Sequence, residues 1–268
     1  MDNKSKSTDV KVEKKDKANQ TAAGFKFKES ETSGKQVFTI YGLKGCGKTT
    51  LALGFSGTIA VLSFDNKSGL VKEKMYDNDE RIKIYDAIEH WTESPEDVTK
   101  SSKTTYDYAI FLLENIKKEV KPDWIVIDGA EIMSRIAEMA MRYNNNLKYT
   151  QGISNLNVWK ERRLMLRNIH RKSIDACKKG VIYTSHVTKD KIVEEGTLIT
   201  ERDIPQYIDM IMWETDCVVR VKATYKKDKG MKFTAEIDSS KLKQLKTGDV
   251  IDITDNMNLL KDGEKDGK

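Results

Sequence analysis

Short, almost continuously apolar runs alternate along the chain with longer segments in which apolar residues recur every three or four positions. The first pattern is typical of strands buried on both faces, and the second is typical of helices that pack one face on a sheet. Strands and helices that alternate in this way favour a mostly parallel sheet. The pattern therefore predicts an α/β domain with helices on both faces of the sheet.

The individual elements follow from these patterns. The apolar runs predict strands over residues 36–41, 58–64, 81–86, 124–127 and 181–184. The helical spacing predicts helices over residues 49–55, 106–120, 132–143, 155–179 and 205–214. Gly57 is expected to end the first helix, and Gly180 is expected to cap the long basic helix 155–179. Two further runs, 217–224 and 231–237, flank the sequence K-K-D-K-G and predict a C-terminal antiparallel hairpin.

The two ends of the chain differ from the segment between them. Residues 1–24 hold almost no large apolar side chains, and the final K-D-G-E-K-D-G-K is equally polar. Such segments cannot bury enough apolar surface to offset the entropy lost on ordering. We therefore expect disordered tails at 1–24 and 257–268, and one folded domain over 25–256.

The composition indicates where the protein works, but it does not indicate which reaction it catalyses. The 268 residues include 47 basic and 42 acidic side chains, a net charge of +5 that permits contact with nucleic acid without requiring it. No apolar run approaches the ~20 residues that a membrane helix needs. The three cysteines lie far apart and form no zinc-binding spacing. These features predict a cytoplasmic protein that makes no contact with a membrane.

A phosphate-binding loop follows the first predicted strand. The sequence G-L-K-G-C-G-K-T fits the P-loop pattern and opens the first predicted helix. Such a loop directs backbone N–H groups at phosphates, while its Lys reaches the β- and γ-phosphates and its Thr binds Mg²⁺. The alternative is a glycine-rich turn without a ligand. The residues predicted to bind ATP are Gly42, Leu43, Lys44, Gly45, Cys46, Gly47, Lys48, Thr49 and Thr50.

A second Mg²⁺ ligand is expected at the end of a core strand. The run W-I-V-I-D ends in Asp128, a carboxylate after four apolar residues. Together with Thr49, Asp128 is predicted to hold the Mg²⁺ of bound ATP. The alternative is an ordinary turn residue.

Hydrolysis also requires groups that position the attacking water and sense the γ-phosphate. Asp65 ends the second predicted strand, and Glu131 lies near the start of a helix. Their alternative roles are to cap a turn and to favour the helix dipole. His186 closes the run V-I-Y-T-S-H, where it either contacts the γ-phosphate or is an ordinary surface residue. The predicted catalytic group is therefore Lys48, Asp65, Glu131 and His186.

Over residues 25–254 the order of these blocks resembles the RecA/RadA superfamily of ATPases, and in particular the Sak-type single-strand annealing ATPases of phages and archaeal viruses. The resemblance is carried by G-F-K-F-K-E, G-L-K-G-C-G-K-T-T-L, V-L-S-F-D, W-I-V-I-D-G, N-V-W-K-E-R-R, V-I-Y-T-S-H-V-T-K-D and D-I-P-Q-Y-I-D-M-I-M-W-E-T-D-C-V-V-R-V. It implies a RecA-like core, a phage or virus origin, and a homo-oligomeric ring or filament that binds ATP between subunits. It also implies action on single-stranded DNA in recombination, repair or replication.

One departure from the resembled family bears on turnover. Those enzymes commonly carry a glutamate two residues after the aspartate that aligns with Asp65, and this chain has Lys67 there. Hydrolysis would then rely on Asp65 or Glu131, or be slow. Two alternatives to a DNA-dependent ATPase therefore stay open: a nucleotide-gated assembly or mediator protein with little turnover, and a small-molecule P-loop kinase.

The basic helix is the candidate DNA surface. Its cations could contact phosphates without sequence preference, whereas its apolar positions are those of any helix that packs on a sheet. The basic residues are Arg162, Arg163, Arg167, Arg171 and Lys172.

Overall fold

A computed structural model describes residues 34–194, 197–206, 214–227 and 230–260. Every described element lies in the compact unit formed by residues 35–268. The predicted tail 1–24 and most of the predicted tail 257–268 lie outside the described residues. None of the helices in the described ranges combines the length and apolar character that a bilayer crossing requires.

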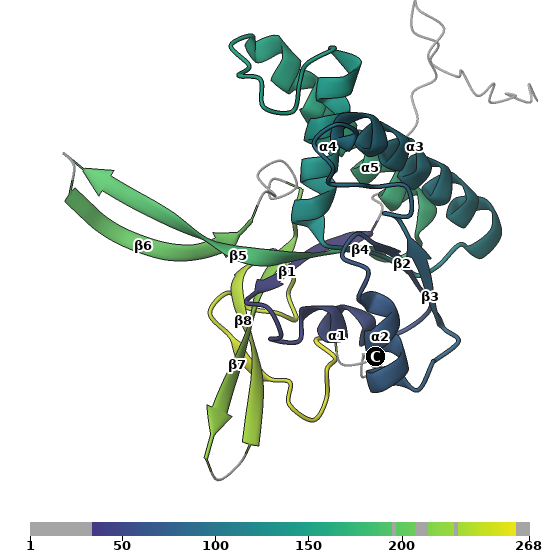
Figure 1. Ribbon diagram of the computed structural model, residues 1–268. Coiled ribbons are helices and arrows are strands. Elements are labelled where there is room, and N and C mark those ends of the chain that lie inside the picture. The colour runs from purple at the N-terminus through teal and green to yellow at the C-terminus, as the bar shows by residue number, and fades with distance from the viewer. Residues whose placement is uncertain (1–33, 195–196, 207–213, 228–229, 261–268) are drawn as a thin grey trace, which may run out of the picture. The chain divides into compact units, whose positions relative to one another are not determined.

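The strands form one mixed sheet (Figure 1) in the order β3-β2-β4-β5-β1-β7-β8-β9, with β6 paired to β5. All pairs from β3 to β7 are parallel, whereas β5–β6, β7–β8 and β8–β9 are antiparallel. The strands are β1 (Gln36–Gly42), β2 (Ile59–Ser63), β3 (Ile82–Asp86), β4 (Trp124–Asp128), β5 (Gly180–Glu194), β6 (Thr197–Pro205), β7 (Cys217–Lys226), β8 (Gly230–Ser240) and β9 (Val250–Asp252).

Helices cover both faces of the parallel part of the sheet, as Figure 1 shows. The helix α1 (Lys48–Leu53) and the helix α2 (Ser68–Tyr76) lie on one face. The other face carries α3 (Val98–Asn115), which continues as the π-helical turn η1 (Ile116–Val120), together with α4 (Ala130–Asn144) and α5 (Leu156–Ala176). The predicted α/β fold, with a mostly parallel sheet and a C-terminal antiparallel hairpin, is confirmed.

Two apolar cores hold these layers together. One joins alternate residues of β2, β4 and β5 to α3, α4 and α5. The other joins the opposite sheet face to α1, β7, β8 and to residues that follow β8, among them Leu245, Ile253 and Leu259. Every residue of β2 and β4 is buried, which explains their continuous apolar sequences. Leu259 is buried at 5% exposure, so the apolar packing continues past residue 256.

The prediction that Gly180 caps the basic helix is wrong. The helix α5 ends at Ala176, and Gly180 is the first residue of β5, between Gln36 on β1 and Trp124 on β4. A Cβ at Gly180 would lie 1.9 Å from the Gln36 carbonyl oxygen. Close approach of the neighbouring strand, and not a helix end, is therefore what requires glycine at this position.

The structure extends β5 far beyond the predicted 181–184. Its second half pairs with β6 in an antiparallel ribbon that projects away from the sheet (Figure 1). The first helix begins at Lys48 and ends at Leu53, earlier than predicted. The helix predicted over 205–214 falls mostly on residues outside the described ranges, and Pro205 itself ends β6.

Candidate functional site

The register of the sheet brings the ends of β1 and β4 to one edge, beside residues 184–186 of the longer strand β5. Gly42 at the end of β1 pairs with His186 of β5, and Asp128 at the end of β4 pairs with Thr184 of β5. Ligands of open α/β sheets bind at this carboxyl edge. The edge therefore gathers the residues that the sequence singled out one by one.

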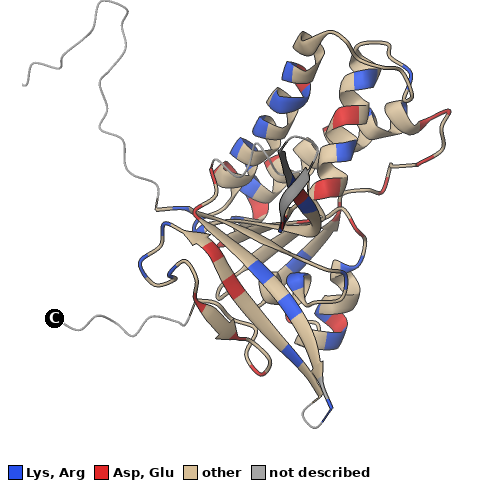
Figure 2. Cartoon of the chain, turned by 90° about the vertical axis from the view of Figure 1, so that its left-hand side faces the viewer, with Lys and Arg blue, Asp and Glu red and all other residues tan. Residues whose placement is uncertain are grey.

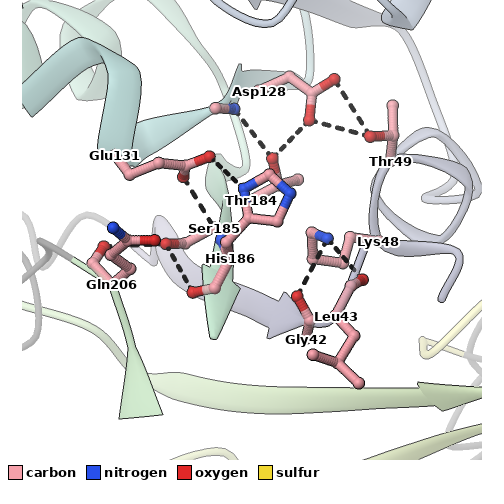
Figure 3. A network of polar contacts seen from close by, with 11 residues as sticks. Gly42, Leu43, Lys48, Thr49, Asp128, Glu131, Thr184, Ser185, His186 and Gln206 are labelled. Carbon is pink, nitrogen blue, oxygen red and sulfur yellow. Dashed lines mark hydrogen bonds and ion pairs between the residues drawn. The ribbon is translucent and has the colours of Figure 1, made fainter. Parts of the chain in front are cut away.

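The P-loop connects β1 to α1. The Lys48 ammonium donates hydrogen bonds to the carbonyl oxygens of Gly42 at 3.1 Å and Leu43 at 3.0 Å (Figure 3), so it lies over the loop. Within the loop, Cys46 is buried and Lys44 is exposed. The lysine is thus held by weak neutral acceptors, which phosphate oxygens can replace with stronger charge-assisted bonds.

Asp128 lies at the centre of a buried hydroxyl network (Figure 3). The Thr49 hydroxyl donates to its carboxylate oxygens at 3.0 and 3.2 Å. The Ser68 hydroxyl also donates to this carboxylate, at 2.6 Å. The Thr184 hydroxyl also donates to Asp128, and it accepts the backbone N–H of Gly129 at 3.1 Å. Neither Ser68 nor Thr184 was predicted from the sequence. The signal for Thr184 was a hydroxyl residue directly after the apolar run V-I-Y.

The carboxyl group of Asp128 is only 1% exposed. Burial raises its pKa above the usual range, the nearby Asp65 carboxylate raises it further, and the hydroxyl hydrogen bonds lower it in part. A cation would relieve this cost, and Mg²⁺ prefers hard oxygen ligands. The hydroxyl of Thr49 and the carboxylate of Asp128, 3.0 Å apart, therefore fit the Mg²⁺ of a bound nucleotide.

Glu131 and His186 form a second polar pair at the same edge. His186 Nδ1 lies 2.5 Å from Glu131 Oε1, and the His186 backbone N–H lies 3.4 Å from Glu131 Oε2 (Figure 3). Glu131 is in the first turn of α4 and is 9% exposed, while the His186 side chain is 40% exposed. Neither residue is isolated on the surface, because each orients the other.

Asp65 follows β2 and lines the same cleft. Its Oδ1 accepts the backbone N–H of Lys67 at 3.0 Å, so it closes a turn at the start of α2. Lys67 is the N-cap residue of α2 and is exposed. The turn uses one carboxylate oxygen of Asp65, and a catalytic role for the other oxygen stays a prediction.

A cleft of about 800 Å³ runs along this edge. It is lined by the predicted residues Lys44, Gly45, Gly47, Lys48, Thr49, Thr50, Asp65, Asp128, Glu131 and His186. Gly42, Leu43 and Cys46 belong to the loop but do not line the cleft in the described part of the chain. The cleft is also lined by residues that were not predicted from the sequence, namely Val71, Met75, Tyr76, Phe233, Thr254, Asp255, Asn256 and Met257.

The basic residues of α5 divide into two groups. Arg162 donates to the Ser134 hydroxyl at 2.5 Å, and Lys172 pairs with Glu114. Arg163, Arg167 and Arg171 are exposed at intervals of four residues, and none has an ion-pair partner within the described ranges. Lys and Arg segments recur along this helix in Figure 2. The helix therefore both packs on the sheet and presents an unpaired cationic stripe.

Two comparisons with known proteins were made first, one with curated sequences and one with solved structures. No curated protein matches the sequence. A solved chain described as "a prototypical ATPase from the type III secretion system of pathogenic bacteria" is 13% identical, with a TM-score of 0.39. The match covers 70% of this chain and 52% of that chain, so this chain spans about half the length of that ATPase.

A family model described as an AAA domain matches residues 34–248. The matched range includes the P-loop, Asp65, Asp128, Glu131 and His186. Because the match covers well over half of the sequence, the chain belongs to the AAA domain family and carries a P-loop NTPase domain.

Proposed function

We propose that the chain binds Mg·ATP in this cleft and hydrolyses it. The observation that supports the proposal most directly is the contact of the Thr49 hydroxyl with the Asp128 carboxylate at 3.0 Å, next to Lys48. These are the three groups that a P-loop ATPase uses to hold the phosphates and their metal ion.

Each polar residue of the cleft is proposed to have one role in binding or hydrolysis. Lys48 leaves the loop carbonyls and binds the β- and γ-phosphates, while Thr49 and Asp128 bind Mg²⁺. Asp65 acts as the general base for water through the oxygen that its turn does not use. His186 contacts the γ-phosphate, and Glu131 is the positioning residue that fixes its ring.

We further propose that this ATPase is RecA-like, forms a homo-oligomer and acts on single-stranded DNA. Arg163, Arg167 and Arg171 support DNA as the client, because these exposed cations form no ion pair among the described residues and are therefore available to phosphates. The order of blocks that resembles Sak-type ATPases supports the same function.

Phosphate release from Mg·ATP, measured with and without single-stranded DNA, tests both parts. We expect turnover that DNA stimulates and that Lys48→Ala abolishes. If DNA leaves the rate of phosphate release unchanged, the proposed action on DNA is contradicted, whereas the proposed ATP hydrolysis still stands. Absence of turnover in the presence of bound ATP would contradict hydrolysis.

The arginine stripe has its own test. The Arg163→Gln, Arg167→Gln, Arg171→Gln triple variant should weaken single-strand binding and reduce the slope of log K against log salt by about 2, since each lost contact contributes about 0.7. A triple variant of the exposed lysines Lys83, Lys100 and Lys246 removes the same charge from other elements and should bind normally. Equal losses in the two variants would indicate a general charge effect and contradict a site on α5.

A nucleotide-gated mediator is the second candidate, and Lys67 is the observation that favours it. Lys67 lines the cleft at the position where the resembled enzymes have a glutamate. A mediator would change its oligomeric state, measured by light scattering, when it binds ATP, and it would release no phosphate. Restoring the acidic group with Lys67→Glu should then raise turnover in a slow enzyme.

A further inference from the structure

The end of the cleft away from Asp128 has a different chemistry from the phosphate end. Its walls are apolar side chains of α2 and β8 together with a segment that follows β9. We call residues 253–257 the C-terminal segment. The apolar side chains are Val71, Met75, Tyr76, Phe233 and Met257.

The core holds this region of the chain on both sides. Ile253 is fully buried, and Leu259 is 5% exposed. The Ile253 N–H donates to the Phe233 carbonyl at 3.0 Å, and the Thr254 hydroxyl accepts the Phe233 N–H at 3.0 Å. Residues 255–257 therefore reach the cleft from a fixed backbone, although they lie beyond the matched AAA domain, which ends at 248.

This region also contacts the P-loop helix directly. A Cβ at Gly54 would lie 1.9 Å from the carbonyl oxygen of Met257, so the backbone of residue 257 packs against the end of α1. A Cβ at Gly47 would lie 3.5 Å from the Phe233 ring and 3.6 Å from the Met257 methyl carbon. The two apolar side chains thus flank the residue that precedes Lys48.

We infer that Phe233 and the C-terminal segment form the nucleobase subsite of the cleft, a role that rests on the proposed binding of ATP. A P-loop fixes the phosphates, and the planar base attached to them needs an apolar surface within reach. Phe233 offers an aromatic face and Met257 a polarizable thioether, both of which suit a base. Asp255 and Asn256, exposed at the rim, offer oxygen acceptors for the exocyclic amino group of adenine.

Calorimetry with Mg·ATP and Mg·tripolyphosphate isolates this subsite, because tripolyphosphate engages the P-loop and carries no base. The wild type should bind ATP more tightly than tripolyphosphate. Phe233→Leu and Met257→Ala should each weaken ATP binding by about tenfold, the usual scale of a lost base contact. Tripolyphosphate affinity should not change, which also shows that each variant is folded.

The matched control is Met231→Ala. Met231 lies two residues before Phe233 on the same face of β8, is 46% exposed and does not line the cleft. The Met231→Ala variant should bind ATP with the affinity of the wild type. Equal affinities of the wild type for ATP and tripolyphosphate, or unchanged ATP binding in both cleft variants, would overturn the inference.

Photocrosslinking the wild type with an azidoadenine nucleotide covers the case in which the variants fail to fold. The label should appear on the peptides that contain Phe233 or residues 253–257, and a label confined to other peptides would overturn the subsite. If neither ATP nor tripolyphosphate binds, the proposed function fails instead, so the two failures are distinguishable.

Discussion

The two ends of the cleft are built in different ways. The phosphate end uses residues at the tips of parallel strands, and its central group, Asp128, is buried in a network of hydroxyls. The opposite end uses α2, one strand of an antiparallel hairpin and the C-terminal segment, and it is mainly apolar. The first end concentrates charge in a few fixed positions, whereas the second spreads weak contacts over several side chains.

This difference has energetic consequences. A buried carboxylate without a cation destabilises the fold, and its ligand gains strong charge-assisted contacts. Apolar contacts add smaller increments to binding and stabilise the fold with or without a ligand. Substitutions at the phosphate end should therefore act mainly on turnover and metal-dependent binding, and those at the apolar end on affinity and stability.

The largest effect is expected from Lys48→Ala. Loss of the ammonium group that donates to the carbonyl oxygens of the P-loop should reduce phosphate release by roughly 10²–10³-fold. The control is Lys83→Ala, an exposed lysine on β3 that does not line the cleft. If the two variants release phosphate at comparable rates, Lys48 does not bind the phosphates during turnover.

Asp128→Asn should weaken binding of Mg·ATP by about a hundredfold, because an amide replaces the carboxylate that we assign to the metal shell. Titration of Mg²⁺ at fixed ATP measures the change. Thr49→Ser keeps the hydroxyl and serves as the conservative control. If the Mg²⁺ dependence of Asp128→Asn matches that of the wild type, Asp128 does not serve the metal ion.

Glu131→Gln should lower kcat by about tenfold while ATP affinity is retained, since it loosens the orientation of His186. Combining it with His186→Ala should add little to the loss from His186→Ala alone, because coupled residues are not additive. Glu114→Gln, an exposed substitution on α3, is the control. Fully additive losses would indicate that the two side chains act separately.

Protonation of Asp128 should link binding and stability to pH with opposite signs. Because burial raises the pKa of this carboxyl, the folded protein without nucleotide loses stability as pH rises from the ordinary carboxyl range through the raised value. Mg·ATP binding, which needs the carboxylate, should weaken as pH falls through the same value. Thermal unfolding across this range should show the destabilisation in the wild type and not in Asp128→Asn. If the stability of the wild type rises with pH over this range and that of Asp128→Asn does not, the predicted link between Asp128 and stability is contradicted.

The smallest effect is expected at the apolar end. Thr254→Val removes the acceptor of the Phe233 N–H and should cost about 1 kcal/mol, or about 2–4 °C in unfolding temperature. Thr224→Val, an exposed change on the same hairpin, should be close to neutral. Phosphate release at saturating ATP should not change in either variant. A large loss of turnover in Thr254→Val would contradict the proposal that the apolar end affects only affinity and stability.

The sequence was informative where local pattern and local structure coincide. Continuous apolar runs identified the core strands, and the P-loop followed by W-I-V-I-D identified Lys48, Thr49 and Asp128 before their proximity was visible. The hairpin β7–β8 was also predicted, because two apolar runs flank a polar turn. In each case a few neighbouring residues carry the signal.

Features that depend on distant segments were missed. The outer half of β5 has the sequence V-T-K-D-K-I-V-E, in which charged residues interrupt the apolar pattern that identified the core strands. This half of the strand pairs with β6. The helix α2 has no clear apolar face, and β9 is only three residues long. Phe233 and Met257 look like ordinary apolar residues, and only the packing of the C-terminal segment on Gly54 brings them to the cleft.

The length of β5 has a mechanical consequence. One continuous strand carries Thr184 and His186 inside the sheet and then runs outward to Glu194 in the projecting ribbon. At about 3.3 Å per residue, roughly 26 Å of strand separates His186 from Glu194, so a tilt of about 5° at the histidine displaces the far end by roughly 2 Å. A rotation of the strand about His186 would therefore displace the end of the ribbon by much more than it displaces the histidine.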